Sequence, residues 1–123
     1  MPSSYRELDV WKRSKALVVR TYGLTAGFPP AEMFGIVSQM RSAALSVPAN
    51  VAEGQARASR NEFVRFIRIS LGSLAELETY FDIARDLGYL SPVVYDELLS
   101  ETDEITKMLH GLIAALRRNQ PGS

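Results

Sequence analysis

The chain has 123 residues, enough for one domain that buries roughly two-thirds of its unfolded surface without cross-links. It contains one histidine and no cysteine, which excludes a zinc site built from these two residue types. Its start lacks the apolar core of a signal peptide, and no run approaches ~18 apolar residues, so we expect a cytoplasmic protein that does not enter a membrane.

Acidic and basic residues are equal in number, but they are unevenly distributed along the chain. Residues 1–68 hold ten Lys/Arg and five Asp/Glu, whereas residues 69–123 hold four and nine. Basic and acidic helices that pair inside a bundle or across a subunit contact would explain this asymmetry, and we favour that interpretation. A basic surface for nucleic acid is the alternative.

Four helical segments are expected, at about residues 5–26, 31–53, 59–87 and 91–118. The first opens with the capping-box pattern of Ser4 and Glu7, and its apolar residues recur at helical spacing as far as Gly27. The second begins near Pro30, a residue suited to a first helical turn. We expect Gly54 to end this second helix.

The third and fourth segments begin with clear capping signals. Ser59 and Glu62 form another capping box, and Ser91 precedes Pro92 as a cap before a first-turn proline. No alternating strand pattern competes, and short connections favour helices that run antiparallel to their neighbours. The predicted fold is all-α, a single domain of residues 1–123 that forms an up-down-up-down four-helix bundle.

The second and third helices each carry an apolar face beyond the one that a lone bundle needs. Arg41 interrupts this face on the second helix, and Glu76 interrupts it on the third. A helix that is apolar on two faces lies at the centre of a larger protein or at an interface, so we expect a homo-oligomer. The predicted interface consists of Phe34, Val37, Leu45, Pro48, Ile69, Tyr80, Ile83 and Leu87.

A line of polar residues runs between the two apolar faces of the second helix. It contains Gln39, Ser46, Asn50 and Glu53, at steps that place them on one side of the helix. Because half-buried polar groups need hydrogen-bond partners, we expect a structural network here. Pro48 removes one backbone donor from the same helix, and we predict a kinked but continuous helix rather than a loop.

No motif in the chain predicts catalysis, so we expect neither an enzyme nor a cofactor. His110 lacks the Glu-x-x-His pattern of a di-iron bundle, and no serine lies in a nucleophile-elbow pattern. A hydrolase or nuclease that uses His110 is the least favoured hypothesis. A nucleic-acid contact surface is a stronger one, with candidate residues Lys12, Arg13, Lys15, Arg20, Arg57, Arg60, Arg65 and Arg68.

Five stretches of the chain match the pattern of a known family. They are LDVW (8–11), FPPAEMFGIVSQMRSAALSVPANVAEG (28–54), EFVRF (62–66), GSLAELE (72–78) and LGYL (87–90). These stretches resemble the bacterial four-helix-bundle family of large-subunit rRNA intervening-sequence proteins, over about residues 5–116. The matching motif residues are Gln39, Arg41, Asn50, Glu53, Gly54, Gly72, Ser73, Glu76 and Glu78. Six of them, Gln39, Arg41, Asn50, Glu53, Glu76 and Glu78, are expected to form a polar network.

The resemblance implies four-helix bundles that assemble as a homopentamer around a central channel, with no catalytic role for the motif residues. Members of this family resemble the accessory protein of diversity-generating retroelements, which binds nucleic acid and a reverse transcriptase through a strongly basic surface. This chain differs by its net charge of zero. We therefore expect an oligomeric scaffold or interaction protein, whose partners are itself and an unknown protein. A pentameric ring that binds RNA or DNA is the alternative.

Overall fold

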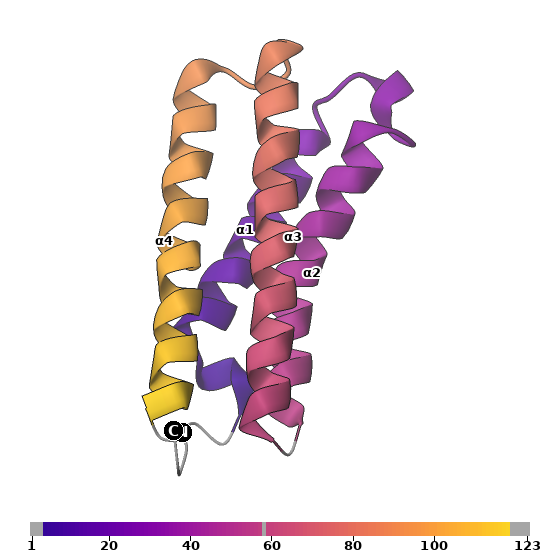
Figure 1. The fold of residues 1–123 in the computed structure, drawn as a ribbon. Helices are drawn as coiled ribbons and strands as arrows, with labels where there is room; N and C mark the ends of the chain where they lie inside the picture. Colours follow the sequence, from indigo (N-terminus) through magenta and orange to yellow (C-terminus); the bar gives the residue numbers. More distant parts are fainter. Residues whose placement is uncertain (1–3, 58, 119–123) are drawn as a thin grey trace.

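The computed structural model describes residues 4–57 and 59–118; the outer parts of the predicted 1–123 domain lie outside this description. The described chain is all-α and contains no strand. Its elements are η1 (Tyr5–Glu7), α1 (Asp9–Thr25), η2 (Pro30–Glu32), α2 (Ile36–Ala56), α3 (Arg60–Asp86) and α4 (Pro92–Arg118), where η marks a single 3₁₀ turn. The four α-helices pack side by side as a bundle, which confirms the all-α prediction (Figure 1).

The connections between helices lie at the two ends of the bundle. The α1–α2 and α3–α4 connections lie at one end, whereas η1, the α2–α3 connection and the end of α4 lie at the other (Figure 1). Helices α2 and α3 share the most extensive contact, and α1 and α4 close the bundle on the far side. Large side chains fully inside the bundle include Met40, Ile67, Leu74, Leu77, Phe81, Leu98, Ile105 and Leu109.

The predicted caps of α3 and α4 are confirmed. The Ser59 hydroxyl accepts from the Glu62 amide at 3.0 Å, and the Ser91 hydroxyl accepts from the Val94 amide at 3.2 Å. Each hydroxyl satisfies an amide that has no partner inside its own helix. Just beyond α3 lies Gly88, whose φ of 80° lets the chain turn.

Helix α1 begins later than predicted. The Ser4 hydroxyl accepts from the Arg6 amide at 3.2 Å and caps only the η1 turn. Leu8 then adopts an extended conformation, which buries its side chain against the bundle, and α1 starts at Asp9. The capping pattern therefore marks a real helical turn, but the buried position of Leu8 ends that turn after three residues.

Helix α2 differs from its prediction at both ends. Pro30 opens the separate η2 turn, and α2 itself begins at Ile36. At its other end the helix continues through Gly54 to Ala56. Gly54 is buried against α3, and a Cβ at this position would lie 2.7 Å from the Cβ of Phe66. The glycine therefore permits the close approach of α2 and α3 and does not end the helix.

Helix α2 runs without interruption through Pro48, as predicted. The proline ring is buried, and the Ser70 hydroxyl of α3 donates to the neighbouring Val47 carbonyl at 2.9 Å. The bend of α2 at this proline stays a prediction. None of the described helices is both long enough and apolar enough to cross a membrane.

Candidate functional site

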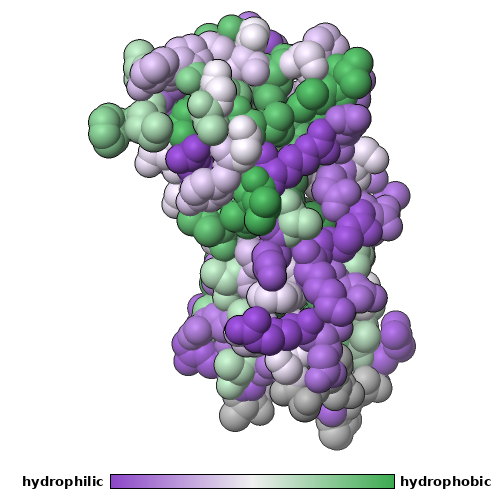
Figure 2. All heavy atoms as spheres, turned by 180° about the vertical axis from the view of Figure 1, so that it is seen from behind, coloured by the Kyte–Doolittle hydropathy of each residue, from purple (hydrophilic) through white to green (hydrophobic). Residues whose placement is uncertain are grey.

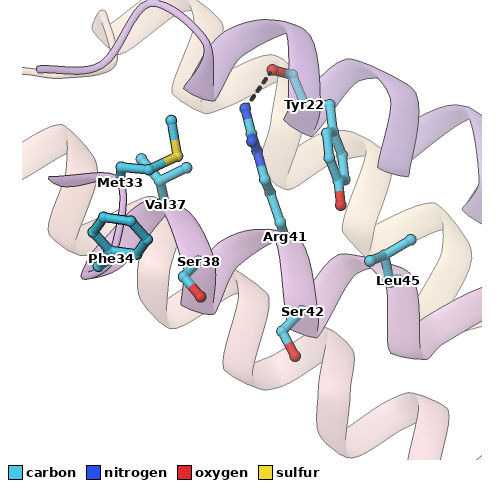
Figure 3. A pocket seen from close by; sticks show the side chains of 8 residues that line it. All are labelled: Tyr22, Met33, Phe34, Val37, Ser38, Arg41, Ser42 and Leu45. Carbon is cyan, nitrogen blue, oxygen red and sulfur yellow. Dashed lines mark hydrogen bonds between the residues drawn. The ribbon is translucent and has the colours of Figure 1, made fainter. Parts of the chain in front are cut away.

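A groove of about 350 Å³ lies between the end of α1 and the start of α2 (Figure 3). Its apolar rim includes Phe34, which is 96% exposed, and the exposed side chain of Leu45. Side chains of this size are seldom left in water unless something covers them or binds to them. The residues that line the groove are Tyr22, Met33, Phe34, Val37, Ser38, Arg41, Ser42 and Leu45.

Arg41 is the charged residue among those that line this groove. Its guanidinium carbon lies 4.4 Å from the centre of the Tyr22 ring, a cation–π contact. Its Nε donates to the Thr25 hydroxyl at 2.9 Å, and its Nη2 makes a longer contact of 3.4 Å with the Tyr22 carbonyl (Figure 3). No ion pair in the described part of the chain includes Arg41. Within the described residues, the groove therefore contains a half-buried cation without an anionic partner.

The outer face of α3 is a second exposed apolar surface. Ile83 is 42% exposed and Leu87 is 53% exposed, and Ile69 lies about four helical turns before Ile83. The Tyr80 hydroxyl donates to the Glu76 carboxylate at 2.9 Å, and this hydrogen bond raises the pKa of Tyr80. Glu76 is thus held by Tyr80 in the middle of an apolar face.

Two residues of the predicted interface lie inside the chain instead. Val37 is 1% exposed, and Pro48 is also buried. Helix α2 packs between α1 and α3. These two neighbours together bury more of its surface than the single core-facing stripe that the sequence pattern indicated. The exposed apolar surface therefore retains Phe34, Leu45, Ile69, Ile83 and Leu87, with Tyr80 half-buried.

The two central residues of the polar line on α2 form hydrogen bonds that extend to α3. The Asn50 amide donates to the Ser46 carbonyl and hydroxyl, both at 2.8 Å. The Ser46 hydroxyl lies 2.7 Å from the Ser73 hydroxyl of α3. These groups join α2 to α3 through small polar side chains that let the two helices pack closely.

The other members of the predicted polar network make contacts separate from this central group. Gln39 contacts the Tyr80 hydroxyl at 3.4 Å, and Glu53 pairs with Arg57 at 2.6 Å in the next turn of α2. Glu78 faces α4, where it accepts from Thr102 at 3.1 Å. Positions that repeat along one helix face need not share partners when neighbouring helices flank that face on both sides.

Arginines gather at the end of the bundle opposite the apolar groove. Arg57 and Arg65 lie on the Phe66 ring, with guanidinium carbons 5.0 Å and 4.5 Å from its centre. Arg65 also pairs with Glu62 at 2.8 Å; this hydrogen bond lowers the pKa of Glu62 and raises that of Arg65. We call this surface the basic end, and it comprises Arg57, Arg60, Arg65, Arg68, Arg117 and Arg118, with Glu53 and Glu62 among them.

A second groove of about 350 Å³ lies at this basic end, between α3 and α4. Arg65, Arg68 and Arg117 line it together with Asn61 and Val64. The sequence predicted Arg65 and Arg68 but missed Arg117. In an up-down bundle the end of the fourth helix lies beside the start of the third. The two arginines that end the fourth helix in the sequence could therefore have been assigned to the same surface as Arg65 and Arg68.

The predicted basic residues of α1 lie apart from this groove. Arg13 forms two hydrogen bonds with Glu101 of α4, at 2.9 Å and 3.0 Å, and Arg20 pairs with Glu97 at 2.6 Å. Lys15 lies over the Trp11 ring at 5.1 Å. Pairing of the α1 arginines with α4 acids agrees with the favoured interpretation of the charge asymmetry. Lys12 is exposed on the same helix.

The described residues contain no cluster of three or more His, Cys, Asp or Glu side chains that could hold a metal ion. His110, the residue of the least favoured hypothesis, is exposed on α4.

The chain matches a known family over most of its length. The family model of the 23S rRNA-intervening sequence protein matches residues 6–111. None of the curated proteins matches the chain. A crystal structure of a protein with unknown function from the S23 ribosomal protein family of Bacteroides thetaiotaomicron is similar, with a TM-score of 0.79 and 24% sequence identity. The match covers 85% of this chain and 95% of that one, and it shows the shared fold.

Proposed function

The chain belongs to the 23S rRNA-intervening sequence protein family, and we propose that it is a non-enzymatic scaffold that works as a homo-oligomer of antiparallel four-helix bundles. The observation that carries this proposal is the exposed apolar surface of α1, α2 and α3. Phe34 alone leaves an aromatic ring almost wholly in water. The family resemblance gives five as the expected number of copies.

The distribution of apolar side chains supports assembly. Figure 2 shows that hydrophobic residues concentrate towards the end that carries the α1–α2 connection, whereas hydrophilic residues dominate the other half of that face. A patch of this kind on a small domain marks an interaction surface. The exposed large apolar residues are Val19, Tyr22, Met33, Phe34, Leu45, Ile69, Ile83, Leu87 and Val93.

Light scattering of the purified chain tests the proposal. A pentamer of 13.7 kDa chains has a mass of about 68 kDa. A monodisperse species of one chain would overturn it. Leu45→Glu should reduce the mass while far-UV circular dichroism stays helical, because the charge would enter an apolar contact. The matched control is Ser100→Glu, a change at an exposed position of α4, which should leave the mass unaltered.

A second candidate function is nucleic-acid binding by the assembled ring. The groove lined by Arg65, Arg68 and Arg117 favours it, because Arg68 and Arg117 have no ion-pair partner in the described part of the chain. Guanidinium groups on a groove wall suit phosphate oxygens.

Electrophoretic retardation of single- and double-stranded RNA and DNA tests this second function. Binding should weaken steeply with added salt, since phosphate contacts release counterions. The Arg68→Gln, Arg117→Gln double variant should bind more weakly, whereas Lys12→Gln should change little because Lys12 lies away from the groove. No retardation at low salt with micromolar protein would rule the function out.

A further inference from the structure

Two exposed faces of the chain each carry one charge in an apolar setting, and the two charges have opposite signs. The groove between α1 and α2 holds Arg41, and the outer face of α3 holds Glu76. We propose that the groove of one copy receives the outer face of α3 from a second copy, with Arg41 against Glu76 and Leu45 against Ile69. This inference rests on the proposed assembly and names the two faces that meet in it.

Arg41 has hydrogen-bonding capacity left for such a contact. A guanidinium carries five N–H donors, and the described chain directs one at the Thr25 hydroxyl and one at the Tyr22 carbonyl. The stacked Tyr22 ring and these two acceptors hold the guanidinium in place before any partner arrives. An incoming carboxylate therefore meets a pre-organised cation, and little side-chain entropy is lost on contact.

Glu76 offers the matching carboxylate. The Tyr80 hydroxyl occupies its Oε1, and no ion pair in the described part of the chain includes it. Ile69 and Ile83 lie seven residues before and after Glu76, so the three side chains follow one line along α3. The face is a ridge one helix wide, apolar at both ends and acidic in the middle.

A contact between the groove of one copy and the α3 ridge of another is favoured over a contact between two identical faces. Groove against groove would bring two Arg41 side chains together, and ridge against ridge would oppose two Glu76 carboxylates. Like charges in contact oppose association, whereas groove against ridge places opposite charges in an apolar surround. Such a contact uses two different faces of each chain, so it can repeat around an axis and close into a ring.

Cysteine cross-linking tests the pairing directly, because the natural chain has no cysteine. A Leu45→Cys variant and an affinity-tagged Ile69→Cys variant are mixed, allowed to exchange subunits, and oxidised. The proposal expects a disulfide-linked dimer of one tagged and one untagged chain, which reducing agent removes. Ser100→Cys on α4 is the matched control and should form no such product with Leu45→Cys.

Charge reversal gives an independent readout of the same contact. Arg41→Glu and Glu76→Arg should each weaken assembly by about tenfold or more in dissociation constant. The double variant should return to within about threefold of the natural chain, since the pair is restored with its signs exchanged. Far-UV circular dichroism checks folding, and the cross-link remains a test even where Arg41→Glu does not fold.

The outcomes separate this inference from the proposed function. An assembly that gives no Leu45→Cys to Ile69→Cys product, or two single reversals that the double variant does not rescue, overturns the pairing and leaves the assembly standing. A natural chain that is monomeric by light scattering overturns both. Mixed disulfide together with rescue supports the groove-to-ridge contact.

Discussion

Arg13 and Glu101 join α1 to α4 through two parallel hydrogen bonds, the geometry in which a guanidinium holds a carboxylate best. The hydrogen bond from Arg13 lowers the pKa of Glu101 below its ordinary value of 4.5. A depressed carboxyl pKa stabilises the folded chain above about pH 4.5, and that contribution is lost as the pH falls through the folded pKa.

Replacing this carboxylate should therefore have a pH-dependent effect. Glu101→Gln should lower the free energy of unfolding at pH 7 by about 1 kcal/mol or less, because both side chains are partly exposed and water screens the pair. Urea unfolding at neutral and at strongly acidic pH, at one protein concentration, measures the effect. The difference from the natural chain should vanish in acid; a difference that persists there would contradict an ionic cause.

Asp103→Asn provides the comparison on the same helix. Asp103 pairs with Lys107 at 3.2 Å, and both side chains are mostly exposed. Its substitution should change the free energy of unfolding less than Glu101→Gln does, since an exposed pair one helical turn apart contributes little.

The contact between α2 and α3 depends on the missing side chain of Gly54. A Cβ there would lie 2.7 Å from the Phe66 Cβ and 3.2 Å from the Phe63 carbonyl, so the two helices would have to move apart. Gly54→Ala should lower the free energy of unfolding by about 1–3 kcal/mol, the usual cost of overpacking. Urea unfolding at fixed protein concentration measures the change.

The same substitution at Gly111 should have the opposite sign. Gly111 lies inside α4 and is exposed, and apart from its chain neighbours and the nearby backbone of α4, a Cβ added there would meet no described atom within 4 Å. Gly111→Ala should raise the free energy of unfolding by up to about 1 kcal/mol, because alanine restricts the unfolded chain and favours the helix. Equal effects at both glycines would show that Gly54 is not needed for close packing.

Pro48 tests whether the shape of α2 matters for assembly. Alanine at this position restores an amide that can donate to the Ala44 carbonyl, so Pro48→Ala should straighten α2. The half of α2 before Pro48 carries Arg41 and Leu45, and straightening would move them relative to the outer face of α3. A crystal structure of the variant and its mass by light scattering measure the two effects. An unchanged helix axis and mass would show that the proline has no such role.

Local signals predicted the elements well, and contacts between helices account for the errors. Ser59 and Ser91 cap their helices as their sequence patterns indicated, because a cap needs only the next few residues. Gly54 was misjudged because a glycine that ends a helix and one that lets two helices touch look alike in sequence. The buried place of Val37 also depends on which helices flank α2, which no single-helix projection contains.

In the whole molecule, basic and acidic residues gather at opposite ends of the bundle rather than on separate helices. The sequence divides into a basic first part and an acidic second part, yet Arg117 and Arg118 from the second part join Arg65 and Arg68 of the first at the basic end. At the opposite end, Asp82 and Asp86 of late α3 and Asp96 and Glu97 of early α4 lie together with Arg85 of late α3. A net charge of zero therefore conceals a basic surface that becomes evident only in the folded chain.

Assembly should multiply this basic surface. In a closed ring every copy has the same orientation to the axis, so all basic ends face the same way and several can contact one nucleic acid. Leu45→Gln removes no charge but weakens the apolar contact, and it should lower nucleic-acid affinity by about a hundredfold. Arg68→Gln should instead keep the assembly intact. It should reduce the salt dependence of nucleic-acid affinity by the equivalent of about one phosphate contact for each copy that binds. Retardation assays across a salt series, paired with light scattering, measure both. A monomeric Leu45→Gln variant that binds as tightly as the assembled chain would contradict the role of the ring, because one basic end would then be sufficient.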